Sequence, residues 1–210
     1  MSAAAVEHPH DDDSYTLLRA ANRIMEQLPG HRVEILEGNI IVAPPADGPH
    51  ASALTTLMIP FLAAGLHGEE SEVLQSLGLW LPTGPADYAV PDLAVVDADY
   101  ANHETENNCY EPVCFRLVLE VTSSNHSNDL KTKVRAYAQA GIPVYVIVDR
   151  KNVRVHLLTD PVGEGYDSHT LYAPGRQLTL PDSIGAKVTL DAGALLEAGG
   201  CRIAGPDATG

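Results

Sequence analysis

Two carboxylates stand at the ends of apolar segments in the middle of the sequence. Asp92 follows Pro91 and precedes the apolar run Leu93–Val96. Glu120 stands at the end of a second apolar run, Leu117–Leu119. If both runs are neighbouring strands, about 4.8 Å apart, the two side chains reach the same place. Burying two negative charges is costly without a compensating cation, so the pair predicts a site for Mg²⁺ or Mn²⁺.

The chemistry expected at such a site is hydrolysis of a phosphodiester. The backbone carbonyl of Val121 follows Glu120 directly and would add an oxygen ligand, with water in the remaining positions. A divalent ion lowers the pKa of a bound water, and this water is the expected nucleophile. Charge then develops on the phosphate, so a nearby lysine or arginine is needed to stabilise it.

The apolar pattern predicts the elements that position these residues. Helices are predicted over residues 14–28, 51–64 and 128–140. Strands are predicted over residues 33–36, 40–43, 72–75, 77–81, 88–96, 116–122, 144–148, 153–157, 170–172, 177–180 and 187–190, with the last three expected to finish the same sheet. Strands and helices do not alternate regularly, which predicts an α/β fold of the mixed α+β kind, with a central mixed sheet flanked by helices.

A single domain is expected over residues 14–198. Residues 1–13 lack periodicity and are predicted to be a disordered tail, and residues 199–210 a flexible one. No segment reaches the roughly 18 to 20 apolar residues of a membrane span, and no signal peptide is evident, so a cytoplasmic protein without membrane contact is expected. The three cysteines show no CxxC spacing and are predicted to be free thiols: Cys109, Cys114 and Cys201.

An ordered series of motifs resembles a known family. In chain order the motifs are Glu34-Ile-Leu-Glu-Gly38, Pro44-Pro45, His50, Pro91-Asp92, Glu120-Val121-Thr122, Asp129-x-x-x-Lys133, Tyr137 and Gly141-Ile-Pro143. This series resembles the Uma family of restriction-endonuclease-like proteins, within the PD-(D/E)XK nuclease superfamily. The resemblance implies a restriction-endonuclease-like fold, a metal-dependent nuclease that cuts DNA, and a homodimer with two sites for two strands.

The lysine of the superfamily's E-x-K motif is missing, because Thr122 stands in its place. The resemblance implies that the lysine is relocated to the next helix, where Lys133 fits. Asp129, Lys133 and Tyr137 are spaced by four and should project from one helix face. An ion pair between Asp129 and Lys133 would hold the lysine in position. A surface ion pair without function is the alternative, worth a few tenths of a kcal/mol.

His50 and Glu34 are predicted as auxiliary site residues. His50, at a helix start, could orient a phosphate or bind the metal, or only make a hydrogen bond there. Glu34 takes a strand position where the superfamily sometimes places a further acid, although an outward-facing glutamate explains it equally well. The plain alternatives for the main pair are that Asp92 ends a turn and that Glu120 makes a strand-end ion pair with a lysine.

The charge of the chain opposes DNA binding, because the formal net charge is -15. Residues 116–154 reverse this balance, with seven basic and three acidic residues and a local charge of +4. A solvated helix face is the plain explanation of such a cluster. The acidity supports a second hypothesis, in which the chain is a catalytically weak or inactive module that uses the nuclease fold for binding or dimerisation.

Overall fold

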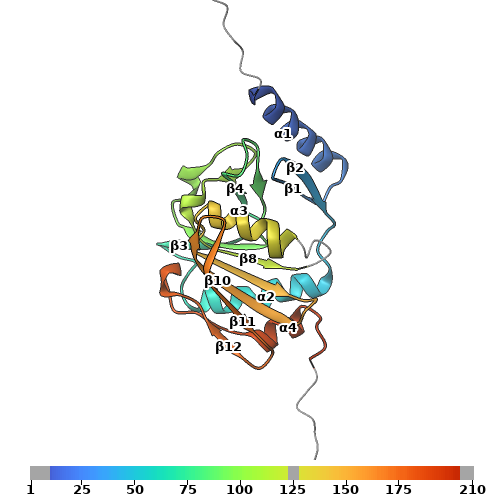
Figure 1. Cartoon of the computed structure of the whole chain (residues 1–210). Coiled ribbons are helices and arrows are strands. Elements are labelled where there is room, and N and C mark those ends of the chain that lie inside the picture. Colours follow the sequence, from blue (N-terminus) through green and yellow to red (C-terminus); the bar gives the residue numbers. More distant parts are fainter. Residues whose placement is uncertain (1–9, 123–127, 204–210) are drawn as a thin grey trace, which may run out of the picture.

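A six-stranded mixed sheet forms the centre of the fold (Figure 1). The computed structural model describes residues 10–122 and 128–203, and the strand order in this sheet is β11-β10-β9-β8-β6-β3. Strands β8 and β9 run parallel, and the other neighbouring pairs are antiparallel. The strands are β3 (Ser71–Gln75), β6 (Leu93–Asp97), β8 (Phe115–Val121), β9 (Val144–Asp149), β10 (Arg154–Val162) and β11 (Gly165–Tyr172). The predicted mixed α+β fold is confirmed.

A second sheet has five short strands in the order β2-β1-β5-β4-β7. They are β1 (Arg32–Leu36), β2 (Asn39–Ala43), β4 (Gly78–Trp80), β5 (Tyr88–Ala89) and β7 (Cys109–Tyr110). Residues 88–96, predicted as one strand, are therefore divided between β5 and β6. Pro91 has no N–H to donate to a ladder, so the chain passes from one sheet to the other around it. Asp92 lies at this crossing, next to β6.

Helices cover both faces of the six-stranded sheet. The helix α2 (Gly48–Ala63) begins earlier than predicted, because Asp47 caps it by accepting from the His50 N–H at 2.7 Å. The predicted helix over residues 128–140 is a π-helical turn, Asn128–Thr132, followed by α3 (Lys133–Gln139). The first helix, α1 (His10–Gln27), begins before the predicted Ser14. The structure also has the helix α4 (Ala192–Ala198) and short 3₁₀ turns at Tyr100–His103, Pro112–Cys114 and Asp182–Ile184.

Alternate residues of the central strands point into two different cores. Leu119 and Val121 of β8 pack with α2 and α4 on one face, whereas Val118 packs with α3 on the other. Because side chains alternate along a strand, Glu120 lies on the same face as Val118, towards α3. The three cysteines are free thiols, as predicted. No helix of the described residues is long and apolar enough to cross a membrane.

The C-terminal segment differs from the prediction in its pairing. Strands β12 (Gln177–Thr179) and β13 (Thr189–Asp191) pair with each other as a separate two-stranded sheet, so they do not finish the central one. Strand β11 begins at Gly165 instead of Thr170, since it forms a long hairpin with β10. None of its residues is buried, so it lacks the apolar alternation that would have marked its start. The short helix α4 was not predicted.

Candidate active site

The two strand-end carboxylates lie on adjacent strands. Strands β6 and β8 pair antiparallel with Leu93 opposite Leu119, which brings Asp92 beside the end of β8. The Asp92 carboxylate accepts a hydrogen bond at Oδ2 from the Val121 N–H at 2.7 Å. Both acids are buried, with Asp92 5% and Glu120 0% exposed. The predicted adjacency of the two strands is confirmed, and both carboxylates require compensation by cations or donors.

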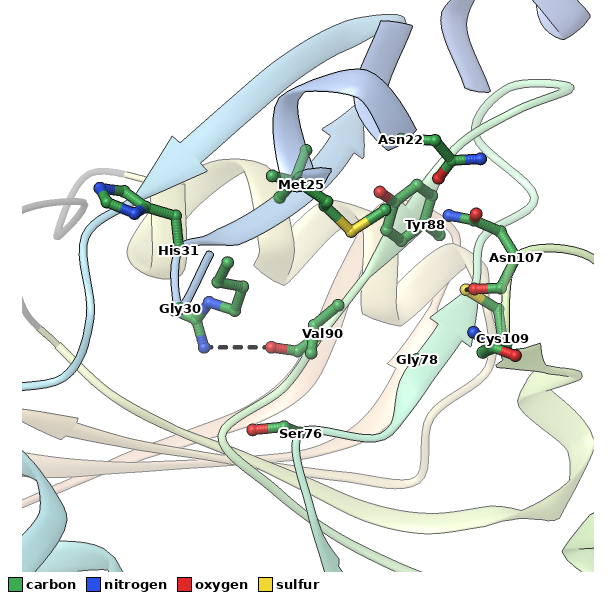
Figure 2. Close-up of a pocket in the computed structure, with 13 residues that line it drawn as sticks. Asn22, Met25, Gly30, His31, Ser76, Gly78, Tyr88, Val90, Asn107 and Cys109 are labelled. Atoms are coloured by element: carbon green, nitrogen blue, oxygen red, sulfur yellow. Dashed lines mark hydrogen bonds between the residues drawn. The ribbon is translucent and has the colours of Figure 1, made fainter. Parts of the chain in front are cut away.

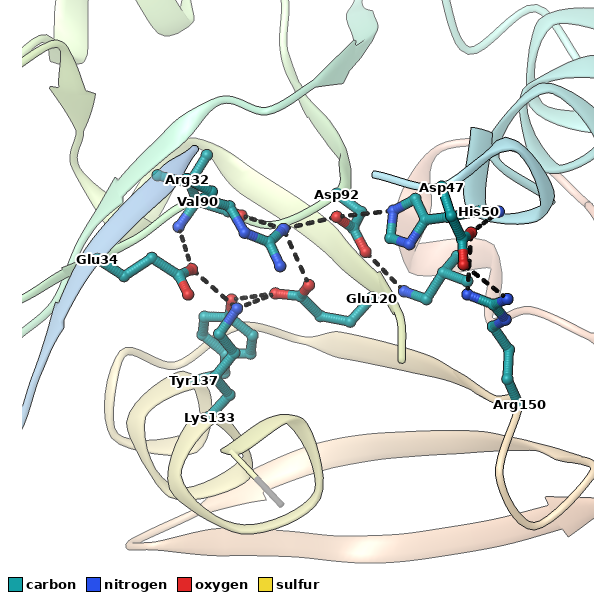
Figure 3. Close-up of polar contacts among 11 residues, drawn as sticks. Arg32, Glu34, Asp47, His50, Val90, Asp92, Glu120, Lys133, Tyr137 and Arg150 are labelled. Atoms are coloured by element: carbon teal, nitrogen blue, oxygen red, sulfur yellow. Dashed lines mark hydrogen bonds and ion pairs between the residues drawn. The ribbon is translucent and has the colours of Figure 1, made fainter. Parts of the chain in front are cut away.

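Lys133 compensates the inner part of this site (Figure 3). Its Nζ lies 2.6 Å from Glu120 Oε1 and 2.8 Å from Glu34 Oε1, and the lysine side chain is only 1% exposed. Tyr137, one helical turn later, donates from its hydroxyl to the same Glu120 oxygen at 2.9 Å. Glu34, which was predicted as an auxiliary site residue, also accepts a hydrogen bond from the Val90 N–H at 2.7 Å. Lys133 is therefore not a surface residue, and Glu34 does not face solvent.

Arg32 and His50 surround the other acid (Figure 3). Arg32 Nη1 lies 2.5 Å from Asp92 Oδ1, and His50 Nε2 lies 3.2 Å from the same oxygen. Burial raises the pKa of Asp92, but the hydrogen bond from His50 and the charge of Arg32 outweigh it, so the pKa falls to about 2. Because its pKa is about 2, Asp92 is ionised throughout the neutral range. The buried His50 Nδ1 has no hydrogen-bond partner among the described residues.

The two carboxylates converge on one cation position, which Arg32 takes. The same Nη1 that contacts Asp92 lies 3.6 Å from Glu120 Oε2. An oxygen pair directed at one cation is the donor set that suits Mg²⁺ or Mn²⁺, so these residues fit such an ion. They do not form a complete cage, since no group of three Asp, Glu, His or Cys side chains in the described part of the chain has metal-ligand geometry.

Arg32 is the residue that the sequence analysis missed. It stands two positions before Glu34 in β1, so both side chains point to the same face of that strand. Sequence reasoning paired the acids with a lysine close by in the chain, whereas Arg32 is 60 residues from Asp92. The only local sign that Arg32 belongs to the site is its spacing of two residues from Glu34. This spacing is informative only when β1 is known to lie near Pro91, where the chain passes between the two sheets.

Two further predicted residues have other outcomes. Thr122, in the place of the superfamily lysine, accepts a hydrogen bond at its hydroxyl from the Arg150 N–H at 3.0 Å, which ties the ends of β8 and β9 together. Asp129 lies in the π-helical turn, but its side chain is outside those that the structure describes. Its pairing with Lys133 therefore stays a prediction. Lys133 is held by Glu34 and Glu120 without it.

The basic region over residues 116–154 is not an open positive surface. At least four of its seven basic side chains are paired with acids: Arg116 with Asp97, Lys133 with Glu34 and Glu120, Arg135 with Glu37, and Arg150 with Asp47. Most of these acids come from outside the segment, so the local excess of +4 counted along the chain is largely cancelled in space. The charges of this region therefore give little support to a broad electrostatic attraction of DNA.

Two cavities meet at Arg32. One, of about 580 Å³, is lined by Asp92 and His50 and by Pro44 and Pro45 of the segment before α2. The other, of about 600 Å³, lies between α1 and strands β4 and β5 (Figure 2). Arg32 lines both, and its side chain is 19% exposed. The Asp92 side of the acid cluster is therefore open to a ligand, whereas the Lys133 side is closed.

The fold and the cluster at its strand ends define a restriction-endonuclease-like protein. Residues 20–193 match the model of the Uma2 family, described as "Putative restriction endonuclease". The chain belongs to this family, which supports a nuclease-like function.

A solved structure has the same fold. It comes from Anabaena variabilis, is described as a "putative nuclease belonging to DUF820", and superposes with a TM-score of 0.61 at 15% sequence identity. The match covers 80% of this chain and 90% of that chain. No curated protein matches the sequence.

Proposed function

We propose that the chain is a metal-dependent nuclease that hydrolyses phosphodiester bonds in DNA. The observation that carries the proposal is the convergence of Asp92 and Glu120 on one cation position, beside a cavity of about 580 Å³. Two carboxylates from neighbouring strands are the ligands that Mg²⁺ or Mn²⁺ prefers. Membership of a family described as "Putative restriction endonuclease" supports DNA as the substrate.

The proposed roles follow from the contacts of each side chain. Asp92, Glu120 and the Val121 carbonyl would hold the ion. When bound, a divalent ion acts as a Lewis acid, lowers the pKa of water and offsets phosphate charge. Lys133 orients the Glu120 carboxylate through its 2.6 Å contact, and Glu34 fixes the lysine from the other side.

His50 has a proposed role on the open side of the site. Its Nε2 holds the Asp92 carboxylate, and it stands in the first turn of α2, at the wall of the cavity. Its other ring nitrogen, Nδ1, is buried and makes no hydrogen bond to any described residue. The proposed role of the ring is to orient a phosphate in the cavity or to bind the metal beside Asp92.

Cleavage of supercoiled plasmid tests the proposal. Wild-type protein should nick or cut DNA with Mg²⁺ or Mn²⁺ and not in EDTA, and Asp92→Asn and Glu120→Gln should each lower the rate at least about a hundredfold. Asp97→Asn is the matched control, because Asp97 stands at the other end of β6 and pairs with Arg116. Full activity in either site variant, purified alongside the control, would refute the assignment and point to a contaminating nuclease.

The second candidate is a nuclease-fold module for binding or dimerisation with little or no catalysis. It is favoured by the ion pairs of the acid cluster, since Arg32 and Lys133 already compensate both carboxylates. Calorimetry distinguishes the two candidates. Absence of Mn²⁺ binding at millimolar concentrations favours the module, whereas binding that Asp92→Asn abolishes favours the enzyme. The homodimer implied by the resemblance stays a prediction, and a monomeric mass in light scattering would contradict it.

A further inference from the structure

We infer that Arg32 is a displaceable cation: it holds the metal position in the metal-free protein and moves to the substrate phosphate when the ion binds. The inference rests on the proposed function of the same site. Its basis is that one guanidinium nitrogen, Nη1, contacts both carboxylates that would hold the ion, at 2.5 Å from Asp92 and 3.6 Å from Glu120. An arginine and a divalent ion cannot share that position, because their centres and their charges would overlap.

Of the two cations in the cluster, Arg32 is the one that can leave. Lys133 is 1% exposed and lies between two carboxylates, Glu34 and Glu120, within 2.8 Å of each. Arg32 is 19% exposed and lines both cavities, so its long side chain has space into which it can move. The same Nη1 also donates a hydrogen bond of 3.1 Å to the Val90 carbonyl, and a guanidinium bonds more strongly to an anionic phosphate than to a neutral carbonyl.

Charge balance gives the displaced guanidinium its destination. The cluster contains three carboxylates, on Glu34, Asp92 and Glu120, and the two cations Arg32 and Lys133, which leaves a formal charge of -1 with His50 neutral. A divalent ion changes this to +1, and one phosphodiester anion restores neutrality. A guanidinium pairs well with phosphate oxygens, so the incoming phosphate is the anion that would receive Arg32.

Metal affinity tests the displacement without depending on catalysis. Arg32→Met removes the competing cation but keeps a chain of similar length, and it should bind Mn²⁺ at least about tenfold more tightly than the wild type in calorimetry at neutral pH. At saturating Mn²⁺ the same variant should cleave DNA at least about tenfold more slowly, because the phosphate contact is lost. Tighter metal binding together with slower cleavage is a combination that a merely structural arginine would not produce.

Two further variants complete the test. Arg116→Met is the matched control, because Arg116 has a similar exposure of 23% and pairs with Asp97 at 2.6 Å, away from the cluster. It should leave Mn²⁺ affinity unchanged. Arg32→Gln replaces Arg32→Met if the latter fails to fold, as judged by circular dichroism.

The possible results separate this inference from the proposed function. Unchanged or weaker Mn²⁺ binding in the Arg32 variants, with clear binding in the wild type, would overturn the displacement and leave the metal site intact. Tighter binding with unchanged cleavage would overturn the phosphate contact. No Mn²⁺ binding by the wild type or by any Arg32 variant would overturn the proposed metal site itself, and the displacement with it.

Discussion

The two ends of the acid cluster are built differently. At the inner end Glu34, Glu120, Lys133 and Tyr137 are each at most 2% exposed and are joined by contacts of 2.6 to 2.9 Å. At the outer end Asp92 faces Arg32, which is 19% exposed and adjoins two cavities. A charged group that is enclosed and paired is costly to disturb, whereas one at a cavity can exchange partners. The inner end therefore fixes geometry, and the outer end is where we propose that ligands bind.

The largest effect is expected from the inner lysine. Lys133→Met leaves Glu34 and Glu120 buried without their shared cation and should lower the free energy of unfolding by about 3 to 5 kcal/mol, measured by urea denaturation. Arg135→Met, on the same helix, removes the pair with Glu37 at an arginine that is 52% exposed, and should cost less than about 1 kcal/mol. Equal losses in the two variants would break the distinction between an enclosed and an exposed pair.

A smaller loss of stability is expected at the outer end when the pH is lowered. The pKa of Asp92 falls from 3.8 to about 2 on folding, so the unfolded chain binds the proton more tightly. The stabilisation, on the order of 2 kcal/mol, is complete above about pH 5 and is lost as the pH falls towards 2. Asp92→Asn should therefore show a flatter dependence of unfolding free energy on pH in this window. The same slope in variant and wild type would contradict the ionised, compensated Asp92.

Tyr137 gives a milder test of the inner end. Burial, reinforced by the neighbouring Glu120, raises the pKa of its phenol well above 10, so the hydroxyl stays protonated and donates to Glu120 across the neutral range. Tyr137→Phe removes one donor from a carboxylate that keeps Lys133, and should cost about 1 to 2 kcal/mol in urea denaturation. A loss as large as that expected for Lys133→Met would mean that the tyrosine and not the lysine holds Glu120.

The smallest effect is expected at the start of α2. Asp47 caps this helix through the His50 N–H and is 56% exposed where it pairs with Arg150. Asp47→Ala should cost about 0.5 to 1 kcal/mol, as for a lost helix cap, and Asp47→Ser should recover most of it. Thermal unfolding of both variants measures this. If Asp47→Ala also lowered Mn²⁺ affinity strongly, the outer end would depend on the position of His50 more than the contacts suggest.

Several features could be predicted from the sequence, because they depend on local patterns. Apolar runs place Asp92 and Glu120 in predicted strands, and helical spacing places Lys133 on the following helix. These patterns are sufficient for the mixed α+β fold, whereas the adjacency of β6 and β8 was a hypothesis that the strand pairing confirms. They fail for β11, where no residue is buried, and for α4, whose seven residues are too few to show a helical period clearly.

Only the tertiary structure distinguishes the acids that matter here from other buried acids. Asp87 is also buried near a strand, but its carboxylate accepts from the Glu37 and Gly38 N–H groups and from the Thr83 hydroxyl, so neutral donors satisfy it. Asp92 also accepts from a backbone N–H, that of Val121, but in addition it faces the Arg32 guanidinium. The sequence determined that Asp92 and Glu120 each adjoin an apolar run that forms a strand, because strand periodicity is local. Which cation meets them was decided by the fold, since Arg32 arrives from a strand of the other sheet and no local pattern encodes that contact.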